Sequence, residues 1–345
     1  MKESKVQEIE PGQSWVVDRF RPEDAEGVRR LFLSVYGEGY PVRTYLEPER
    51  LIRENADGRT LSSVARTPKG DVVGHNALFR SAPHPGVYES GAGLVHVAYR
   101  GGKGLFTRLV AHGQEEAGRR PGVDAIFGES VCNHVFSQKM CRSLGWGTMA
   151  LEVDLMPAAA YTQEGSATGR VASLLDFRTI RSRPHRVFLP AVYEDDLRFL
   201  YQRLDDPRDL VPSEEPMPAD GRTRIRTRRF DFAQVARMAV TEAGKDFEAA
   251  LAKEEATLDA AGVQVNQVWI PLFEPWAGEA ARVLRDRGYF LGGVLPRWFD
   301  RDGLLMQRIA VPPSWDGVIL QFDRAKALLE RVRADWEAVV ANRGS

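Results

Sequence analysis

The chain has little cysteine, no long apolar run and almost no net charge. Only Cys132 and Cys141 occur among its 345 residues, which is too few for a disulfide framework, so we expect reduced thiols in a cytoplasmic protein. Cysteine and histidine do not recur at metal-ligand spacing, and no metal site is expected. No segment approaches the roughly 18 apolar residues of a membrane span, and the N-terminus lacks the apolar core of a signal peptide.

The charge balance argues against binding to nucleic acid or to a membrane. Lysine and arginine total 47 against 48 acids, which leaves a net charge of −1. This balance gives no general attraction to nucleic acid or to an anionic membrane, so we expect neither as a partner. The length allows two domains with a large core.

The most informative segment is 94–106, where a short apolar run leads into a glycine-rich basic turn and then into a helix. Glycines let a backbone approach a pyrophosphate closely, and the first N–H groups of a helix point at negative charge. Lys103 is followed by Gly104 rather than Ser or Thr, and Gly101, Gly102 and Gly104 do not fit Gly-x-Gly-x-x-Gly. The pattern favours neither a Walker-type loop nor a Rossmann dehydrogenase, but it predicts a local site for a phosphate-bearing cofactor.

The N-terminal half alternates strand and helix patterns in a definite order. Hydrophobic periodicity and turn residues predict strands at 14–20, 61–65, 72–79, 94–97, 124–129 and 148–155, and helices at about 22–35, 48–55, 104–119 and 133–144.

The glycine-rich turn resembles the acyl-CoA-binding segment of the GNAT superfamily of N-acyltransferases, Gln/Arg-x-x-Gly-x-Gly/Ala, and the element order over 14–157 resembles that family as well. Arg100 stands one residue early, and Phe106 takes the place of the final small residue, so we expect its ring to turn into the helix–sheet core. The resemblance implies an α/β (α+β) fold of two GNAT-like domains, 1–157 and 158–345. Each would have a mixed, mostly antiparallel sheet flanked by helices.

The resemblance also implies where acetyl-CoA, or another acyl-CoA, would lie. In the family the pantetheine arm pairs with the fourth strand and the loop amides hold the diphosphate. Carried over by position, Val95 and Val97 would make the strand contacts. The turn residues implied in diphosphate binding are Arg100, Gly101, Gly102, Lys103, Gly104 and Leu105.

Acyl transfer to an amine needs a base for the ammonium proton. Glu89 precedes the 94–97 strand, and Glu129 ends the 124–129 strand. Either carboxylate is a candidate base, and a solvated strand-end glutamate is the alternative for each. His96 is a candidate titrating group or a core histidine.

The same reaction needs an acid for the leaving thiolate. Family members often place a tyrosine four residues before a Gly-aromatic pair, which here is Gly145-Trp146, so the resemblance assigns the acid to Cys141. A buried apolar role for this thiol stays open, as does protonation by water or Ser137.

Acceptor recognition has two candidates by position in the family. Tyr40 lies in the 37–41 loop and either lines a pocket or packs in the core. Asn133 starts the predicted 133–144 helix and either lines the acceptor channel or caps the helix.

The C-terminal half resembles a second, degenerate copy. The strand at 264–271, the helix at 275–287 and the pair Gly288-Tyr289 follow the GNAT pattern, but no glycine cradle precedes them and Leu284 holds the acid position. We expect this half to be structural or to help bind the acceptor. An arginine row would face a phosphate or an acidic acceptor, or form a solvated sheet face; its members are Arg222, Arg224, Arg226, Arg228 and Arg229.

The resemblance therefore implies an acyl-CoA-dependent N-acyltransferase, with acetyl-CoA as the expected donor and a small-molecule or peptide amine as acceptor. Transfer would be direct, without a covalent enzyme intermediate. One alternative is a non-catalytic acyl-CoA-binding regulator or interaction protein. Another is a transferase that uses aminoacyl-tRNA, which predicts a basic groove that the balanced charge does not favour.

Overall fold

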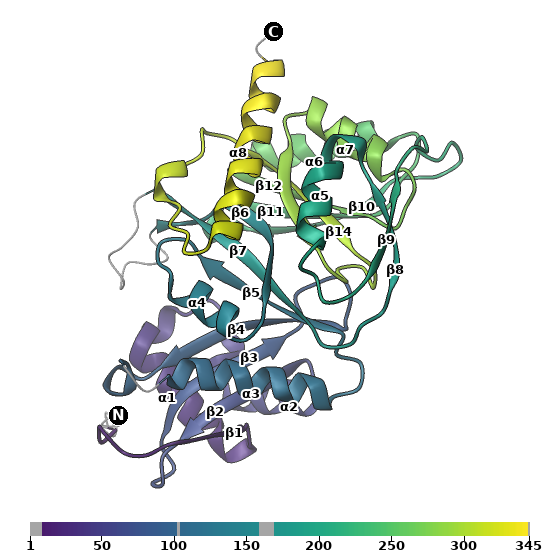
Figure 1. Cartoon of the computed structure of the whole chain (residues 1–345). Helices are drawn as coiled ribbons and strands as arrows, with labels where there is room; N and C mark the ends of the chain where they lie inside the picture. Colours follow the sequence, from purple (N-terminus) through teal and green to yellow (C-terminus); the bar gives the residue numbers. More distant parts are fainter. Residues whose placement is uncertain (1–8, 102–103, 159–168, 344–345) are drawn as a thin grey trace. The chain divides into compact units, whose positions relative to one another are not determined.

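The computed structural model describes residues 9–101, 104–158 and 169–343, and the chain divides into two compact units, Met1–Phe127 and Gly128–Ser345 (Figure 1). The division falls inside strand β5 (Ala125–Val131), earlier in the chain than the predicted boundary at 157. Within the described part of the chain, no helix combines the length and apolar character needed to cross a bilayer.

The first unit is built on a sheet in which neighbours along the chain are neighbours in space. Strands β1 (Val16–Arg19), β2 (Thr60–Arg66), β3 (Val72–Phe79) and β4 (Val87–Val95) pair antiparallel in that order. The beginning of β5 then pairs parallel to β4. A parallel pair needs a crossover, which α3 (Leu105–Arg119) provides.

Each face of this sheet has its own apolar core, because side chains alternate along a strand. Val64 and Val72 pack with residues of α1 (Ala25–Tyr36) and α2 (Pro48–Ala56). Their sequence neighbours Ala65 and Val73 pack on the other face, under Leu105 and Leu109 of α3. The helix that follows the glycine-rich turn is therefore fixed to the sheet by its apolar side.

The second unit continues from the end of β5. Its sheet has the order β5-β7-β6-β13-β14-β12-β11-β10, and β8 pairs with β9 separately. The strands are β6 (Gly147–Pro157), β7 (Arg170–Thr179), β8 (His185–Leu189), β9 (Arg208–Pro212), β10 (Arg224–Phe230), β11 (Val235–Glu242), β12 (Val265–Pro271), β13 (Phe290–Leu295) and β14 (Gly303–Ile309). The helices are α4 (Phe136–Ser143), α5 (Glu194–Tyr201), α6 (Phe247–Ala260), α7 (Ala277–Asp286) and α8 (Asp323–Arg343).

Two segments of the chain share one strand order. β11 and β12 pair parallel around α6, as β4 and β5 pair parallel around α3. β14 lies between β12 and β13, as β7 lies between β5 and β6.

The helices before β6 and β13 also end alike. The Trp146 amide donates to the Cys141 carbonyl at 2.9 Å, and the Tyr289 amide donates to the Leu284 carbonyl at 3.0 Å. In each case a left-handed glycine, Gly145 or Gly288, ends the helix.

The predicted α/β fold with a mixed, mostly antiparallel sheet is confirmed, while several predicted boundaries are wrong. The predicted 94–97 strand is the end of a longer β4, which stops at Val95 because a 3-10 turn, Val97–Tyr99, follows. The predicted 133–144 helix begins only at Phe136. Strand β7 was not predicted, although the buried run from Val171 to Leu175 carries its signal.

Candidate functional site

The end of β4 extends beyond its pairing with β5. β4 pairs with the first unit's part of β5 at Val87, Tyr88 and Glu89, and then runs six residues further to Val95. The His96 amide donates to Val73 of β3 at 2.9 Å. Because a trans peptide directs its C=O opposite to its N–H, the Val95 carbonyl points away from β3. The last residues of β4 thus carry backbone groups directed to the side opposite β3.

The start of α3 offers backbone donors next to the end of β4. The first bond within the helix runs from the Arg108 amide to the Gly104 carbonyl, so the amides of Leu105, Phe106 and Thr107 have no partner inside the helix. Gly104 is the N-cap, is left-handed (φ 61°), and contributes no side-chain cap. Gly101 also has a positive φ, and an added Cβ at either glycine would meet no described atom within 4 Å. The predicted residues Gly102 and Lys103 lie outside the described residues.

Arg100 and Val97 lie just after β4, and Val97 differs from its predicted place in the strand. The Arg100 Nε donates to the Val95 carbonyl at 2.9 Å, so this guanidinium holds the turn against the end of β4. Val97 lies in the 3-10 turn with 69% of its surface exposed, not in the strand. Its predicted strand contact is therefore wrong, whereas Val95 is the last residue of β4. His96, expected inside the strand, is the N-cap of the same turn.

Phe106 turns into the helix–sheet core as predicted. Its ring packs with the cluster that includes Leu105 and Leu109. A Cβ at Gly93 of β4 would lie 2.5 Å from Phe106 Cε2. The bulky residue at the family's small position is thus accommodated by the missing side chain at Gly93.

Glu89 and Tyr40, both predicted from the sequence, belong to the first unit. Glu89 is partly exposed and sits in β4 at the last residue paired with β5. Tyr40 packs on Phe32 and Tyr36, with ring centroids 4.9 and 5.0 Å apart respectively. Burial raises the pKa of the Tyr40 phenol well above its usual value, and the charges of Tyr36 and Glu89 raise it further. Tyr40 therefore packs in the core of the first unit, and it lies close to Glu89.

Glu129, the second candidate base, is held in an ion-pair network of the second unit. Arg237 Nη2 of β11 lies 2.9 Å from Glu129 Oε1 and 2.9 Å from Glu152 Oε1. Gln267 Nε2 donates to the same Glu152 oxygen at 2.9 Å. Burial raises the pKa of Glu152 to about 7, against the lowering effect of Arg237 and with the nearby charge of Glu129 adding to the rise. Arg237 already binds the Glu129 carboxylate, so this geometry disfavours Glu129 as the base.

Cys141, the predicted acid, lies in a buried polar cluster. Its side chain is 3% exposed, and its Sγ is 3.4 Å from Ser130 Oγ, which donates to Asp176 at 2.6 Å. Burial raises the pKa of this thiol far above its ordinary value, and the charge of Asp176 adds to the effect. The structure therefore places Cys141 as a packing residue rather than as a group that meets substrate.

Asn133 does not cap α4 as predicted. The helix begins at Phe136 with Val135 as its N-cap, and no side chain caps it. Asn133 precedes the start of α4 and is buried, with 6% of its surface exposed.

The arginine row, apart from Arg222, lies on β10, an outer strand of the second unit's sheet. Arg224 pairs with Glu242 at 3.2 Å, Arg229 pairs with Asp231, and Arg228 covers the Phe230 ring at 4.7 Å. These contacts fit the solvated-face interpretation.

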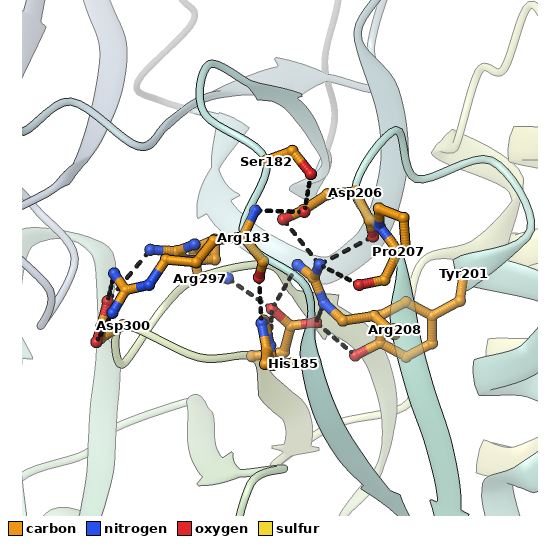
Figure 2. Close-up of polar contacts among 10 residues, drawn as sticks. Ser182, Arg183, His185, Tyr201, Asp206, Pro207, Arg208, Arg297 and Asp300 are labelled. Carbon is orange, nitrogen blue, oxygen red and sulfur yellow. Dashed lines mark hydrogen bonds and ion pairs between the residues drawn. The ribbon is translucent and has the colours of Figure 1, made fainter.

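The sequence analysis did not identify a polar cluster of the second unit that brings together His185, Tyr201 and Arg208 (Figure 2). The buried Asp302 carboxylate accepts from Tyr201 and Arg208, and His185 Nε2 lies 3.2 Å away. Burial alone would raise the pKa of Asp302, but the bond from His185 and the charge of Arg208 hold it well below its usual value. Because His185 begins β8 and Arg208 begins β9, the cluster fixes both strands to the β13–β14 turn. A cavity of about 360 Å³ lies beside it, lined in part by Tyr201, Asp206 and Arg208.

Comparison with known proteins gives matches at the level of structure only. No protein-family model matches the sequence, and no curated protein matches it either. The ribosomal-protein-S5-alanine acetyltransferase of Vibrio fischeri is 14% identical with a TM-score of 0.38, and the match covers 50% of this chain and 94% of that one. A structure of yncA from Salmonella typhimurium with its cofactor acetyl-CoA is 16% identical, with a TM-score of 0.38 and coverage of 49% and 96%.

Mutant forms of the spermidine/spermine N-acetyltransferase SpeG from Vibrio cholerae are 12% identical, with a TM-score of 0.38 and coverage of 48% and 95%. Each match thus spans nearly the whole of the other protein and about half of this chain.

Proposed function

We propose that the protein is an acyl-CoA-dependent N-acyltransferase that moves an acyl group, with acetyl-CoA as the expected donor, directly to an amine. The proposal is carried by one observation: β4 runs six residues beyond its last pair with β5 and leads through a left-handed glycine to the first amides of α3, which have no partner inside the helix. An extended pantetheine arm can add to the edge of such a strand, as another strand does, and a helix N-terminus suits a diphosphate.

In the proposed reaction the acceptor nitrogen attacks the thioester carbonyl, the C–S bond breaks, and CoA leaves as a thiolate that takes up a proton. Glu89 is the proposed base, because it is partly exposed at the last position where β4 pairs with β5. Glu129 is not, because Arg237 already binds its carboxylate. Cys141 is left out because of its burial.

The C-terminal half is proposed to be a degenerate second copy of the same fold. The shared strand order and the matching helix ends at Cys141–Trp146 and Leu284–Tyr289 support this. Between β11 and α6 the chain has Gly244 but no glycine-rich basic turn, so we assign no second donor site there.

The test is an assay of acyl transfer by the full-length protein with acetyl-CoA and a panel of small and peptide amines. Release of free CoA measures the reaction. Glu89→Gln is expected to lower kcat by about 10²-fold or more with little change in acetyl-CoA affinity. Glu129→Gln is the matched control and is expected to retain most of the rate. Loss of activity in Glu129→Gln alone would contradict the assignment of the base.

The burial of Cys141 favours one alternative, a protein that binds acyl-CoA without catalysis. Such a protein would bind acetyl-CoA in a calorimeter and release no CoA with any amine. Release of CoA that depends on an amine excludes it.

A further inference from the structure

Strand β4 carries one extra residue beside the proposed donor site. Gly91 pairs with Ala77 and Leu94 pairs with His75, so Ala92 and Gly93 together lie opposite Asn76. This is a β-bulge, and Ala92 adopts a left-handed φ of 47°, which is costly for a residue with a Cβ. Something in the surroundings must hold this conformation in place.

His75 makes the contact that does so. Its Nδ1 lies 2.9 Å from the Ala92 carbonyl oxygen, which can only accept, so Nδ1 carries the proton. The ring is fully buried between Phe32 and Tyr45, with ring centroids 5.5 and 5.3 Å away. Burial lowers the pKa of His75 to about 4, so the ring is neutral at physiological pH.

The other ring nitrogen shows that packing alone does not explain this residue. Nε2 is buried and has no hydrogen-bond partner among the residues that the structure describes, and an unsatisfied buried acceptor costs stability. An apolar side chain of similar size would fill the same space without that cost. What the imidazole adds is the single bond to Ala92.

That bond fixes the direction of the next amide. No cis peptide occurs in the described residues, so the Ala92 carbonyl and the Gly93 N–H point in opposite directions. With the carbonyl held toward His75, the Gly93 N–H points away from the core formed with α1. Gly93 is also the residue that the Phe106 ring covers.

We propose that His75 is a positioning residue that sets the Ala92–Gly93 peptide, and through it the backbone groups that align the acyl thioester on β4. The inference rests on the proposed function. We therefore expect that replacing His75 impairs the alignment of bound acyl-CoA rather than its binding. His75 lies in the core and not at the turn that would hold the diphosphate.

The experiment compares two variants of the full-length protein. His75→Leu removes the hydrogen-bond donor to the Ala92 carbonyl and fills the space with an apolar side chain. His75→Asn keeps an N–H hydrogen-bond donor near the position of Nδ1. The readouts are the Kd of acetyl-CoA, the kcat and KM of transfer, and the infrared carbonyl band of bound acetyl-CoA labelled with ¹³C at the thioester carbon.

We expect His75→Leu to bind acetyl-CoA within about threefold of wild type, to lose about 10- to 100-fold in kcat, and to shift the carbonyl band toward that of free acetyl-CoA. His75→Asn should recover most of both. Equal kcat in wild type and His75→Leu, or equal loss in both variants with an unchanged carbonyl band, overturns the inference.

If His75→Leu does not fold, His75→Gln, whose amide reaches beyond the Nδ1 position, replaces it in the same comparison with His75→Asn. Failure of wild type to bind acetyl-CoA would instead overturn the proposed function, and that result is read before any variant is compared.

Discussion

Gly93 of β4 lies directly under the ring of Phe106, the bulky residue at the start of α3. A Cβ built at Gly93 would be 2.5 Å from Phe106 Cε2 and 2.8 Å from its Cζ. This contact explains how α3 packs closely on β4 although Phe106 replaces a small residue of the GNAT pattern. The contact packs the end of β4 against the start of α3, and these are the two parts of the proposed acyl-CoA site.

Gly93→Ala is therefore expected to destabilise the protein by about 1–3 kcal/mol, because the added methyl group must displace the ring. Denaturant unfolding measures the change. Phe106→Leu should restore part of the loss in the double variant. Gly113→Ala in α3 is the control, since its Cβ would meet neighbours only at 3.6 Å or more, and it should not destabilise.

Asp302→Asn is expected to cost about 1–3 kcal/mol, because Arg208 would lose one of its two buried carboxylate partners and keep only Asp206. The folded-state pKa of Asp302 lies below its unfolded value, so its contribution is present above about pH 4 and is lost as the pH falls further. The wild-type advantage over the variant should therefore shrink on acidification. Asp209→Asn, which breaks an exposed pair with Arg186, should change stability by less than about 0.5 kcal/mol. An equal effect of both substitutions would refute the role given to Asp302.

Glu152 should give the opposite pH dependence. Burial raises its folded-state pKa to about 7, above the unfolded value of 4.5, so its stabilising effect is present below about pH 4.5 and is lost as the pH rises toward 7. The stability difference between wild type and Glu152→Gln, followed by unfolding from pH 4 to 8, should therefore move in favour of the variant as the pH rises. A difference that stays constant over this range would show that the carboxyl does not titrate there.

Local patterns predicted the parts of the fold that depend on local chemistry. The β2–β3 hairpin, α3 and the glycine that ends α4 follow from turn residues, helical periodicity and a left-handed C-cap. The turn of Phe106 into the core also followed, because its neighbours on α3 are apolar at helical spacing. These features need no knowledge of distant residues.

The features that were missed depend on distant residues. Arg237 meets Glu129 from a position 108 residues away, and nothing near either residue in the sequence marks the pair. The bulge at Ala92 is set by His75 on the neighbouring strand, so periodicity within β4 does not reveal it. The polar cluster around Cys141 likewise includes Asp176 on β7, a strand the sequence analysis did not find.

The central claim, that the start of α3 holds the diphosphate of an acyl-CoA, is tested most directly by titrating acetyl-CoA into the full-length protein in a calorimeter. Gly104→Val is compared with Gly122→Val, since both glycines have a positive φ and open surroundings and only Gly104 lies at the helix start. The account predicts saturable binding to wild type and Gly122→Val, and binding at least about tenfold weaker to Gly104→Val. Equal affinity in all three proteins, or no binding to wild type, would contradict it.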